Sequence, residues 1–311
     1  MIKCKDMGFI NIIMAMKNNK HAYLIMAHHD FAILIELLKD IDDIRNDIYL
    51  HIDLKTKNVP YNDIDKSVKH AKLYLIPRLN VRWGGYSQIN CELRLMEYAL
   101  KQGKYSYFHL LTGATFPLKS QDYIHAFFDK NADKEFIGFA NDNCRERVEY
   151  YYLFNEIGKA NTLLKRILVS IRYRFILLQK VVRYKRSCSK GLLIKKGFVY
   201  WSITENTARV ILNKELQIKK WCKNGLCVDE IFAQTIIANY IGMDKVYSPE
   251  NEYKSCMREC PWHEKDEAHK ENFYRYGDDN LLINSDKLFA LKFGGKEGLD
   301  LIDSIRTNRK F

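Results

Sequence analysis

Short apolar runs of strand length alternate with segments of helical spacing along the first 80 residues of the chain. Residues 31–41 carry apolar side chains three or four positions apart, which predicts a helix, and 62–71 is a second helical candidate. Uninterrupted apolar strands between helices are typical of a parallel sheet. We therefore predict an α/β fold with a Rossmann-type, mostly parallel central sheet and helices on both faces. The strand candidates are 22–27, 47–52, 73–76, 107–111, 135–139 and 197–204.

Polar side chains follow the first three predicted strands. His28, Asp53 and Arg78 stand at or just beyond the ends of the first, second and third strand. In open parallel sheets, ligands bind beyond the carboxyl ends of the strands. The three residues are therefore candidates for a binding site at that edge of the sheet.

A glycine pair precedes the helix predicted from about residue 88 to 101. Gly84 and Gly85 stand beside Trp83 in this connection. Such a pair permits close approach of the backbone to a ligand, although it also serves as an ordinary turn.

The stretch 225–240 holds a candidate catalytic group. A glycine turn leads into Asp229 and Glu230, and an apolar helix follows. Glu230 is expected in the first helical turn, where the helix dipole favours an ionised carboxylate that could act as a general base. In the alternative reading Asp229 caps the helix and Glu230 only complements its dipole. The apolar stripe of this helix is Phe232, Ala233, Ile236, Ile237 and Tyr240.

The segment 159–196 is strongly basic. No acid occurs between Glu156 and Glu205, and the whole chain carries a formal net charge of +12. The pattern predicts a basic amphipathic helix that either docks on an anionic membrane surface or packs on the domain with its basic side in water. We expect a cytoplasmic protein, with peripheral contact at the inner face of the membrane on the first reading. The apolar stretch 7–16 is too short to span a bilayer.

Composition describes a well-packed globular protein, because 47% of 311 residues are apolar and only 5 are proline. The 8 cysteines are expected as free thiols, since a chain of this size does not need disulfides. Two short helices are expected over 278–283 and 286–292. A zinc site could be drawn from cysteines and a histidine, but their spacing is not the usual structural pattern. Its ligands would be Cys222, Cys227, Cys256, Cys260 and His263.

The chain lacks the G-x-x-x-x-G-K-[ST] and G-x-G-x-x-G phosphate-binding motifs. Asp63 and Asp65 resemble the Asp-x-Asp metal site of many nucleotide-sugar enzymes, but two acids are ordinary at the start of a helix. A diphosphate bound without a metal needs lysine or arginine to meet its charge. The candidates are Lys270, Arg275 and Lys292.

Seven short stretches, in order along the chain, are similar to the motifs of one enzyme family. They are AYLIMAHHD (22–30), DIYLHIDLK (47–55), VRWGGYSQI (81–89), FHLLTGATFPLKS (108–120), GFVYWSIT (197–204), CVDEIFAQTII (227–237) and SDKLFALKF (285–293). The sequence thereby resembles the core-2/I-branching glycosyltransferase family, which includes the peptide O-xylosyltransferases. The sequence resembles the bacterial branch of this family in particular, and the similarity covers about residues 20 to 293.

The resemblance implies a GT-A-like fold in a single glycosyltransferase domain over 1–311, with 159–196 as a basic helical insertion. It implies inverting transfer of GlcNAc or xylose from UDP-GlcNAc or UDP-xylose to an acceptor hydroxyl, with no divalent metal or other cofactor. The acceptor is expected to be a glycan, a lipid-linked oligosaccharide or a protein. No nucleic acid partner is expected.

The same resemblance implies roles for single residues. Glu230 matches the family's general base, Lys292 the basic residue that contacts the diphosphate, and Asp53 the acid on the uridine side. His28 lies in the matching loop after the first strand, and Arg78 joins the donor-binding candidates through its position at a strand end. The expected acceptor-binding residues are Trp83, Gly84, Gly85 and Trp201.

The sequence also departs from the family pattern. Thr115 stands where members usually carry an aspartate, which questions the acceptor contacts of that loop, and Leu291 stands where many bacterial members have arginine. Lys270 and Arg275 compete for a second diphosphate contact. Two other functions stay open: a basic module that binds membranes or polyanions, and a protein that binds a UDP-sugar without transferring it.

Overall fold

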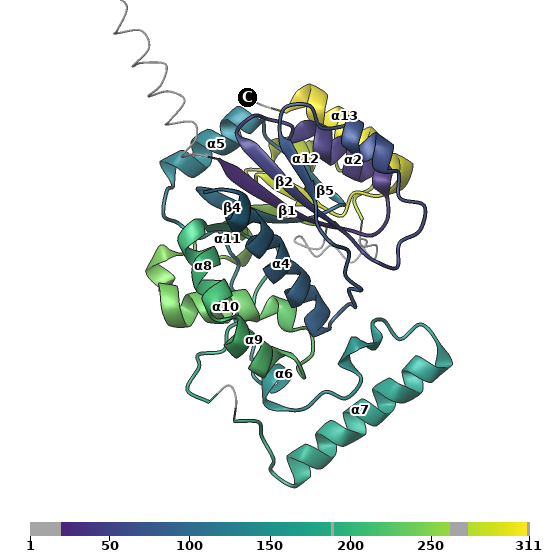
Figure 1. The fold of residues 1–311 in the computed structure, drawn as a ribbon, viewed down its shortest axis with the longest axis vertical. Helices are drawn as coiled ribbons and strands as arrows, with labels where there is room; N and C mark the ends of the chain where they lie inside the picture. Colours follow the sequence, from purple (N-terminus) through teal and green to yellow (C-terminus); the bar gives the residue numbers. More distant parts are fainter. Residues whose placement is uncertain (1–19, 188–189, 262–272, 310–311) are drawn as a thin grey trace, which may run out of the picture.

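The computed structural model describes residues 20–187, 190–261 and 273–309 (Figure 1). A five-stranded sheet of order β3-β2-β1-β4-β6 forms its centre. The first four strands along the chain run parallel, and the last joins the edge antiparallel to β4. The predicted α/β fold with a mostly parallel sheet is confirmed. The strands are β1 (His21–Ala27), β2 (Asn46–Ile52), β3 (Lys72–Leu75), β4 (Tyr107–Thr112) and β6 (Ser202–Thr204).

Both faces of this sheet are covered, as the continuous apolar strands predict. Successive side chains of a strand point to opposite faces. In β1, Leu24 joins the core cluster that contains α4 (Tyr86–Gln102), whereas Tyr23 and Ile25 join the cluster that contains α2 (Phe31–Asp40). Further helices on the faces include α5 (Gln121–Lys130) on the α2 side, and α8 (Glu205–Asn213), α9 (Glu215–Cys222) and α10 (Phe232–Ile236) on the α4 side.

A small second sheet, of order β5-β8-β7, carries the C-terminal part of the chain. Its middle strand, β8, pairs antiparallel with β5 and parallel with β7. The helix predicted over 286–292 is therefore wrong, because the buried apolar residues of this stretch pair as a strand. The elements are β5 (Thr115–Pro117), β7 (Arg258–Glu259), β8 (Phe289–Leu291), α12 (Asp279–Asn284) and α13 (Gly295–Asn308).

Two predicted strands are shorter than their apolar patterns suggest. Of 197–204, only Ser202–Thr204 forms a strand. Of 135–139, Glu135 and Phe136 make only isolated bridges, to Val246 and Ser202. The side chains of Phe136 and Ile137 are fully buried, so core packing rather than strand pairing explains the apolar run.

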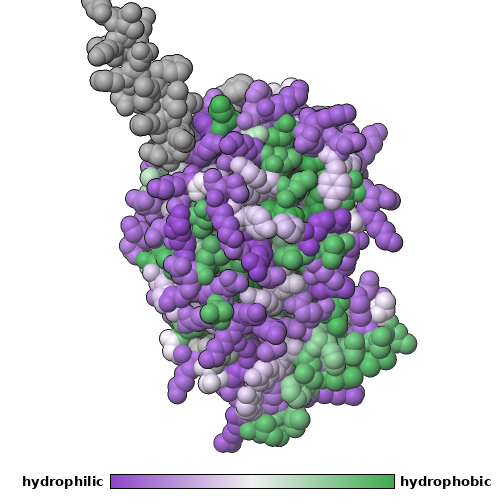
Figure 2. Space-filling view, viewed as in Figure 1, coloured by the Kyte–Doolittle hydropathy of each residue, from purple (hydrophilic) through white to green (hydrophobic). Residues whose placement is uncertain are grey.

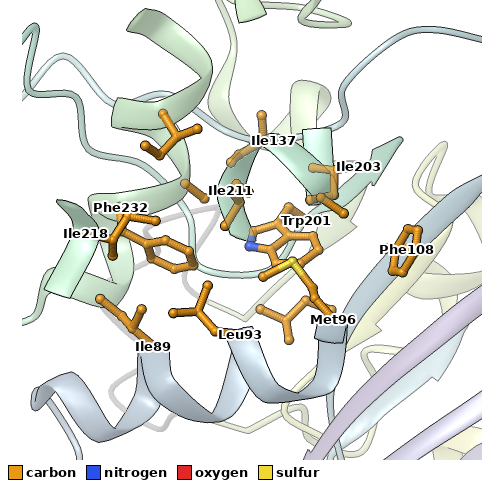
Figure 3. Close-up of a cluster of buried hydrophobic side chains, with 14 of the residues drawn as sticks. Ile89, Leu93, Met96, Phe108, Ile137, Trp201, Ile203, Ile211, Ile218 and Phe232 are labelled. Atoms are coloured by element: carbon orange, nitrogen blue, oxygen red, sulfur yellow. The ribbon is translucent and has the colours of Figure 1, made fainter. Parts of the chain in front are cut away.

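The larger core cluster lies between the central sheet and α4 (Figure 3). Trp201 is completely buried there, beside Met96, Ile203 and Ile211. Large aromatic side chains contribute strongly to core stability through the area that they bury. This cluster fixes α4 and α10, the helices next to the candidate site.

The basic segment contains one long helix, α7 (Leu163–Val181), at the edge of the molecule (Figure 1). Thr162 caps it, its side chain accepting a hydrogen bond from Lys165 N–H. None of the helices in the described parts of the chain is long and apolar enough to cross a membrane. The apolar stretch 7–16 lies outside the described residues.

Candidate active site

The parallel register brings the ends of β1 and β2 together. Ala27 pairs with Ile52 as the last residues of the two strands, and Asp53 N–H donates to Ala27 O at 2.9 Å. Thr56 Oγ1 donates to His28 O at 3.0 Å. His28 and Asp53 are therefore neighbours at the carboxyl edge of the sheet, as their sequence positions predict.

The Asp53 carboxylate is held by Lys55. One oxygen accepts from Lys55 N–H at 2.8 Å, and the other lies 2.6 Å from Lys55 Nζ. Burial opposes ionisation, but these hydrogen bonds outweigh it and lower the pKa of Asp53. Since a carboxylate has about four lone-pair sites, Asp53 can still accept bonds from a ligand. The sequence analysis did not identify Lys55 as a residue of the candidate site.

Arg78 holds the loop that follows β2. Its guanidinium donates to the backbone carbonyls of Ile52, Asp53, Leu54 and Thr56, with the Asp53 bond at 2.7 Å. These contacts explain why an arginine follows the third strand. Donor binding by Arg78 stays a prediction, and the contacts in the structure are those of a residue that shapes the loop.

Lys292 emerges from β8 next to the end of β4. Its backbone has a φ of 84° and its N–H donates to Ala114 O at 2.9 Å. Within the described residues its ammonium has no ion-pair partner, and burial together with Lys159 lowers its pKa. Desolvation, His29 and Lys292 in turn lower the pKa of His28. A partly buried ammonium without a carboxylate partner is suited to receive an anionic group.

The structure says less about Arg275 and Lys270, the other two candidates for contact with the diphosphate. Arg275 lies in the turn before α12, where its N–H donates to Asp278 Oδ2 at 2.7 Å. Lys270 lies outside the described residues.

Glu230 is not in the first turn of an α-helix, so that expectation is wrong. It ends a short 3₁₀ turn, Val228–Glu230, and Ile231 with φ of −124° separates this turn from α10. The helix continues as a π-helical turn, Ile237–Ile241, in which Tyr240 is 39% exposed instead of joining the buried stripe. Such π-turns are common at functional sites.

An arginine and a lysine approach the Glu230 carboxylate. Arg147, in α6 (Glu146–Glu149), pairs with Oε2 at 2.6 Å, and Lys196 Nζ lies 3.9 Å from the same oxygen. Oε1 makes no hydrogen bond among the described residues, and the side chain is 34% exposed. One oxygen is thus oriented by cations while the other can accept a proton. Arg147 is 83 residues away in sequence, so no local pattern could have indicated it.

Asp229 is the middle residue of this turn; its side chain is buried and caps no helix, which removes the alternative reading. Its Oδ2 accepts from Gln88 Nε2 at 3.1 Å. Burial and the neighbouring Glu230 raise the pKa of Asp229 to about 7. Burial also raises the pKa of Glu92, with Asp229 contributing. Two carboxyl groups with raised pKa values, Asp229 and Glu92, therefore lie close to the exposed carboxylate of Glu230.

Tyr200 connects the two parts of the site. Thr112, at the end of β4, lies close enough to the Tyr200 hydroxyl to lower its pKa. Tyr200 also lies close enough to Asp229 and Glu92 for their charges, with burial, to raise its pKa. Tyr200 therefore lies between the carboxyl edge of the sheet and the turn that carries Glu230.

The glycine loop lies against the same turn. Gly84 has a φ of 74° and accepts a hydrogen bond from Cys227 N–H at 2.9 Å. A Cβ at Gly85 would lie 2.3 Å from an oxygen of Glu156, whose carboxylate accepts from Ser87. Trp83 beside them is 57% exposed. The glycine pair therefore permits close packing of protein segments, and its predicted ligand contact stays a prediction.

Comparison with known proteins identifies the family of the chain. A model of the family described as Core-2/I-Branching enzyme matches residues 21–278. The chain belongs to this family. The mouse protein Xylosyltransferase 2 is 28% identical over 130 residues, which are 40% of this chain and 15% of that relative. The chain therefore matches only a small part of that relative's length.

Two positions bear on the acceptor side expected for a core-2/I-branching enzyme. Trp201 is fully buried in the core, so the prediction that it lines an acceptor site does not fit the structure. Thr115, where an aspartate is usual, is also buried and accepts a hydrogen bond from Thr112 N–H at 3.2 Å. It supports the turn between β4 and β5 from inside the fold.

The described residues contain no group of three or more His, Cys, Asp or Glu side chains placed to hold a metal ion. Asp63 lies in the first turn of α3 (Tyr61–Lys66), as expected for a residue that complements the helix dipole. His263, one of the zinc ligands considered from the sequence, lies outside the described residues.

Proposed function

We propose that this chain is an inverting glycosyltransferase that moves GlcNAc or xylose from a UDP-sugar to an acceptor hydroxyl. The family match over residues 21–278 carries the assignment to glycosyltransferases. The name of the mouse relative, Xylosyltransferase 2, favours a sugar of this kind. The acceptor would be a glycan, a lipid-linked oligosaccharide or a protein.

The donor would bind at the carboxyl edge of the sheet. Asp53 would accept hydrogen bonds from the uridine, and Lys292 would meet the charge of the diphosphate, with Lys159 nearby as a second cation. Charge-assisted hydrogen bonds from lysine to phosphate would neutralise the diphosphate charge, as a divalent cation does in other enzymes. Metal independence is part of the proposal.

Glu230 would act as the general base. As the acceptor oxygen attacks the anomeric carbon, its proton passes to Glu230 Oε1. The bond from that carbon to the β-phosphate oxygen breaks, and its electron pair leaves on UDP, so the anomeric configuration inverts in one displacement. The supporting observation is the ion pair at 2.6 Å between Arg147 and Oε2, which orients the carboxylate and leaves Oε1 accessible.

A reducing compartment fits the cysteines. Among the described cysteines, Cys91, Cys144, Cys227 and Cys256 are free thiols, and all of these but Cys227 are buried. We place the protein in the cytoplasm on this ground.

The test is hydrolysis and transfer with a panel of UDP-sugars, each with and without EDTA. We expect slow release of UDP from UDP-GlcNAc or UDP-xylose and no loss with the chelator. Loss of turnover with EDTA and its recovery with manganese would refute metal independence. Failure to bind any UDP-sugar would refute the donor site.

A further inference from the structure

The long helix α7 buries polar side chains and exposes apolar ones. Figure 2 shows hydrophobic residues gathered along it at the edge of the molecule. In an ordinary surface helix the apolar stripe faces the core. In α7 this arrangement is reversed. Packing against the rest of the chain therefore does not explain why the helix carries so many apolar side chains.

Polar contacts hold α7 on the body. Arg172 is 5% exposed and donates to the backbone carbonyls of Leu153 and Phe154, the first at 2.8 Å. Gln179 is 4% exposed and bonds to both the N–H and the C=O of Tyr151, at 2.9 and 3.0 Å. With Ile176, these side chains form the buried face of the helix.

The outward surface carries a set of large apolar side chains. Leu163 is 75% exposed and Val181 is 79% exposed, at the two ends of the helix. Between them, Leu164, Ile167, Ile171 and Leu178 follow helical spacing and line one side. Contiguous exposed apolar surface of this kind marks a place where another apolar phase or molecule binds. The exposed apolar residues of this surface are Leu163, Leu164, Ile167, Ile171, Leu177, Leu178, Val181 and Val182.

The charge around this surface has one sign. Between Glu156 and Glu205 the sequence has 12 lysines and arginines and no acid. Lys180 and Lys185 are neutralised by Glu146 and Glu149 of the body, each at 2.8 Å. In the described part of the chain no carboxylate pairs with Arg166, Arg174 or Arg183. The exposed apolar stripe is thus accompanied by arginines whose charge is free to meet an anionic partner.

We propose that α7 is a docking surface for an anionic lipid bilayer and lies in the plane of its headgroups. Apolar side chains would enter the acyl boundary while the arginines contact lipid phosphates, which is the binding mode of interfacial amphipathic helices. A second copy of the chain fits less well, because pairing of two α7 helices would bring their arginines together. Charge complementarity therefore selects the bilayer as the occupant.

The segment that leads into α7 connects this surface to the candidate active site. Glu156 accepts hydrogen bonds from Ser87 N–H at 3.0 Å and Ser87 Oγ at 2.6 Å, at the start of α4. Lys159 is close enough to Lys292 to lower its pKa. Docking would therefore hold the site near the lipid surface. The proposal itself concerns lipid binding and does not depend on the transferase activity.

The experiment is co-sedimentation of the full chain with vesicles of phosphatidylcholine alone or with 30 mol% phosphatidylglycerol. Binding is expected only to the anionic vesicles, and it should weaken as salt rises. The variant Arg166→Gln/Arg174→Gln should lose about thirtyfold in affinity, since each surface cation contributes about 1 kcal/mol. The variant Leu164→Ser/Ile171→Ser/Leu178→Ser should lose about tenfold or more.

Matched controls remove like residues at the other end of the molecule. Ile44→Ser, at a 68% exposed position, and Lys130→Gln/Lys296→Gln should bind vesicles as the unchanged chain does. Circular dichroism melts would confirm that all variants fold. Equal binding to both vesicle types, no binding to anionic vesicles at low salt, or α7 variants that bind normally would each overturn the proposal. A dimer in sedimentation that only the apolar α7 variant disrupts would assign the surface to a second copy.

Discussion

Glu230 reaches its place through residues from separate parts of the chain. Arg147 pairs with its carboxylate, Gly197 N–H donates to its carbonyl at 2.9 Å, and Asp229 lies buried beside it. The carboxylate is thus fixed at both backbone and side chain. In the proposed role of general base, Glu230 would therefore lose little entropy when the acceptor arrives.

The first prediction concerns Glu230→Gln. The amide keeps the size of the side chain but cannot take a proton, so transfer should fall by about 10²- to 10⁴-fold, the usual contribution of a general base. UDP affinity should stay close to its original value, because the base acts in the transition state. Turnover is measured by UDP release and affinity by calorimetry. Glu146→Gln, which removes a carboxylate paired with Lys180, is the control, and normal turnover of Glu230→Gln would exclude the residue as base.

Lys292→Met tests the donor site. The variant keeps an unbranched side chain but removes the ammonium that has no ion-pair partner among the described residues. UDP binding should weaken by about 10- to 100-fold, as expected for the loss of one charge-assisted hydrogen bond. Calorimetric titration with UDP measures the change. An unaltered dissociation constant would remove Lys292 from the site, and Lys296→Met at an exposed position controls for loss of charge.

At the scale of elements, the glycine loop and the segment before α7 are fitted to each other. The Glu156 carboxylate occupies the space in which a side chain at Gly85 would lie, and it caps the start of α4 through Ser87. The loop, α4 and the docking helix are therefore connected through one carboxylate. A change at any of the three should affect the others.

A double-mutant cycle tests this connection. Gly85→Ala should lower the free energy of unfolding by about 1 kcal/mol, because the new methyl group displaces the carboxylate from its hydrogen bonds. In the Glu156→Ala background the same substitution should cost almost nothing, so the coupling energy should be about 1 kcal/mol. Urea denaturation of the four proteins measures it. Additive effects would show that the two residues do not interact.

At the scale of the whole molecule, three buried histidines join the central sheet to α5. His125 stacks on His21 at 4.0 Å between ring centroids, and its Nε2 lies 2.9 Å from Asn46 Oδ1 in β2. His21 in turn contacts His109 of β4 at 3.0 Å. Burial lowers the pKa of all three, and that of His125 to about 4 with a contribution from Arg45.

The variant His125→Gln tests the lowered pKa of His125 through the pH dependence of stability. The folded state keeps His125 neutral while the unfolded chain binds a proton below pH about 6.5, so His125 loses stabilising effect as pH falls from about 6.5 to about 4. As the pH falls, the unfolding free energy of the unchanged protein should therefore decrease relative to that of the variant, by up to about 1.4 kcal/mol per pH unit. Urea titrations at pH 7, 6 and 5 measure it. A constant difference would contradict the prediction, with His70→Gln at an exposed position as control.

Local sequence patterns determined the sheet, the helices that cover it and the meeting of His28 and Asp53 at its edge. The periodicity of each segment and the alternation of strands and helices depend on neighbouring residues, so they can be predicted from the sequence. The acceptor role that the family resemblance implied for Trp201 does not fit the structure, because an aromatic residue in a family motif can serve the core as well as a ligand. Local patterns failed over 286–292, where pairing with β5 and β7 overrides helical spacing.

Only the tertiary structure decided which charges meet. Arg147 with Glu230 and Glu156 with Ser87 are contacts between residues far apart in the sequence, and Lys159 comes close enough to Lys292 to lower its pKa. It also decided that α7 turns its apolar side outward, since the amphipathic pattern is the same whichever face is buried. A sequence fixes the period of a helix, whereas the surface that the helix meets depends on every other element that folds around it.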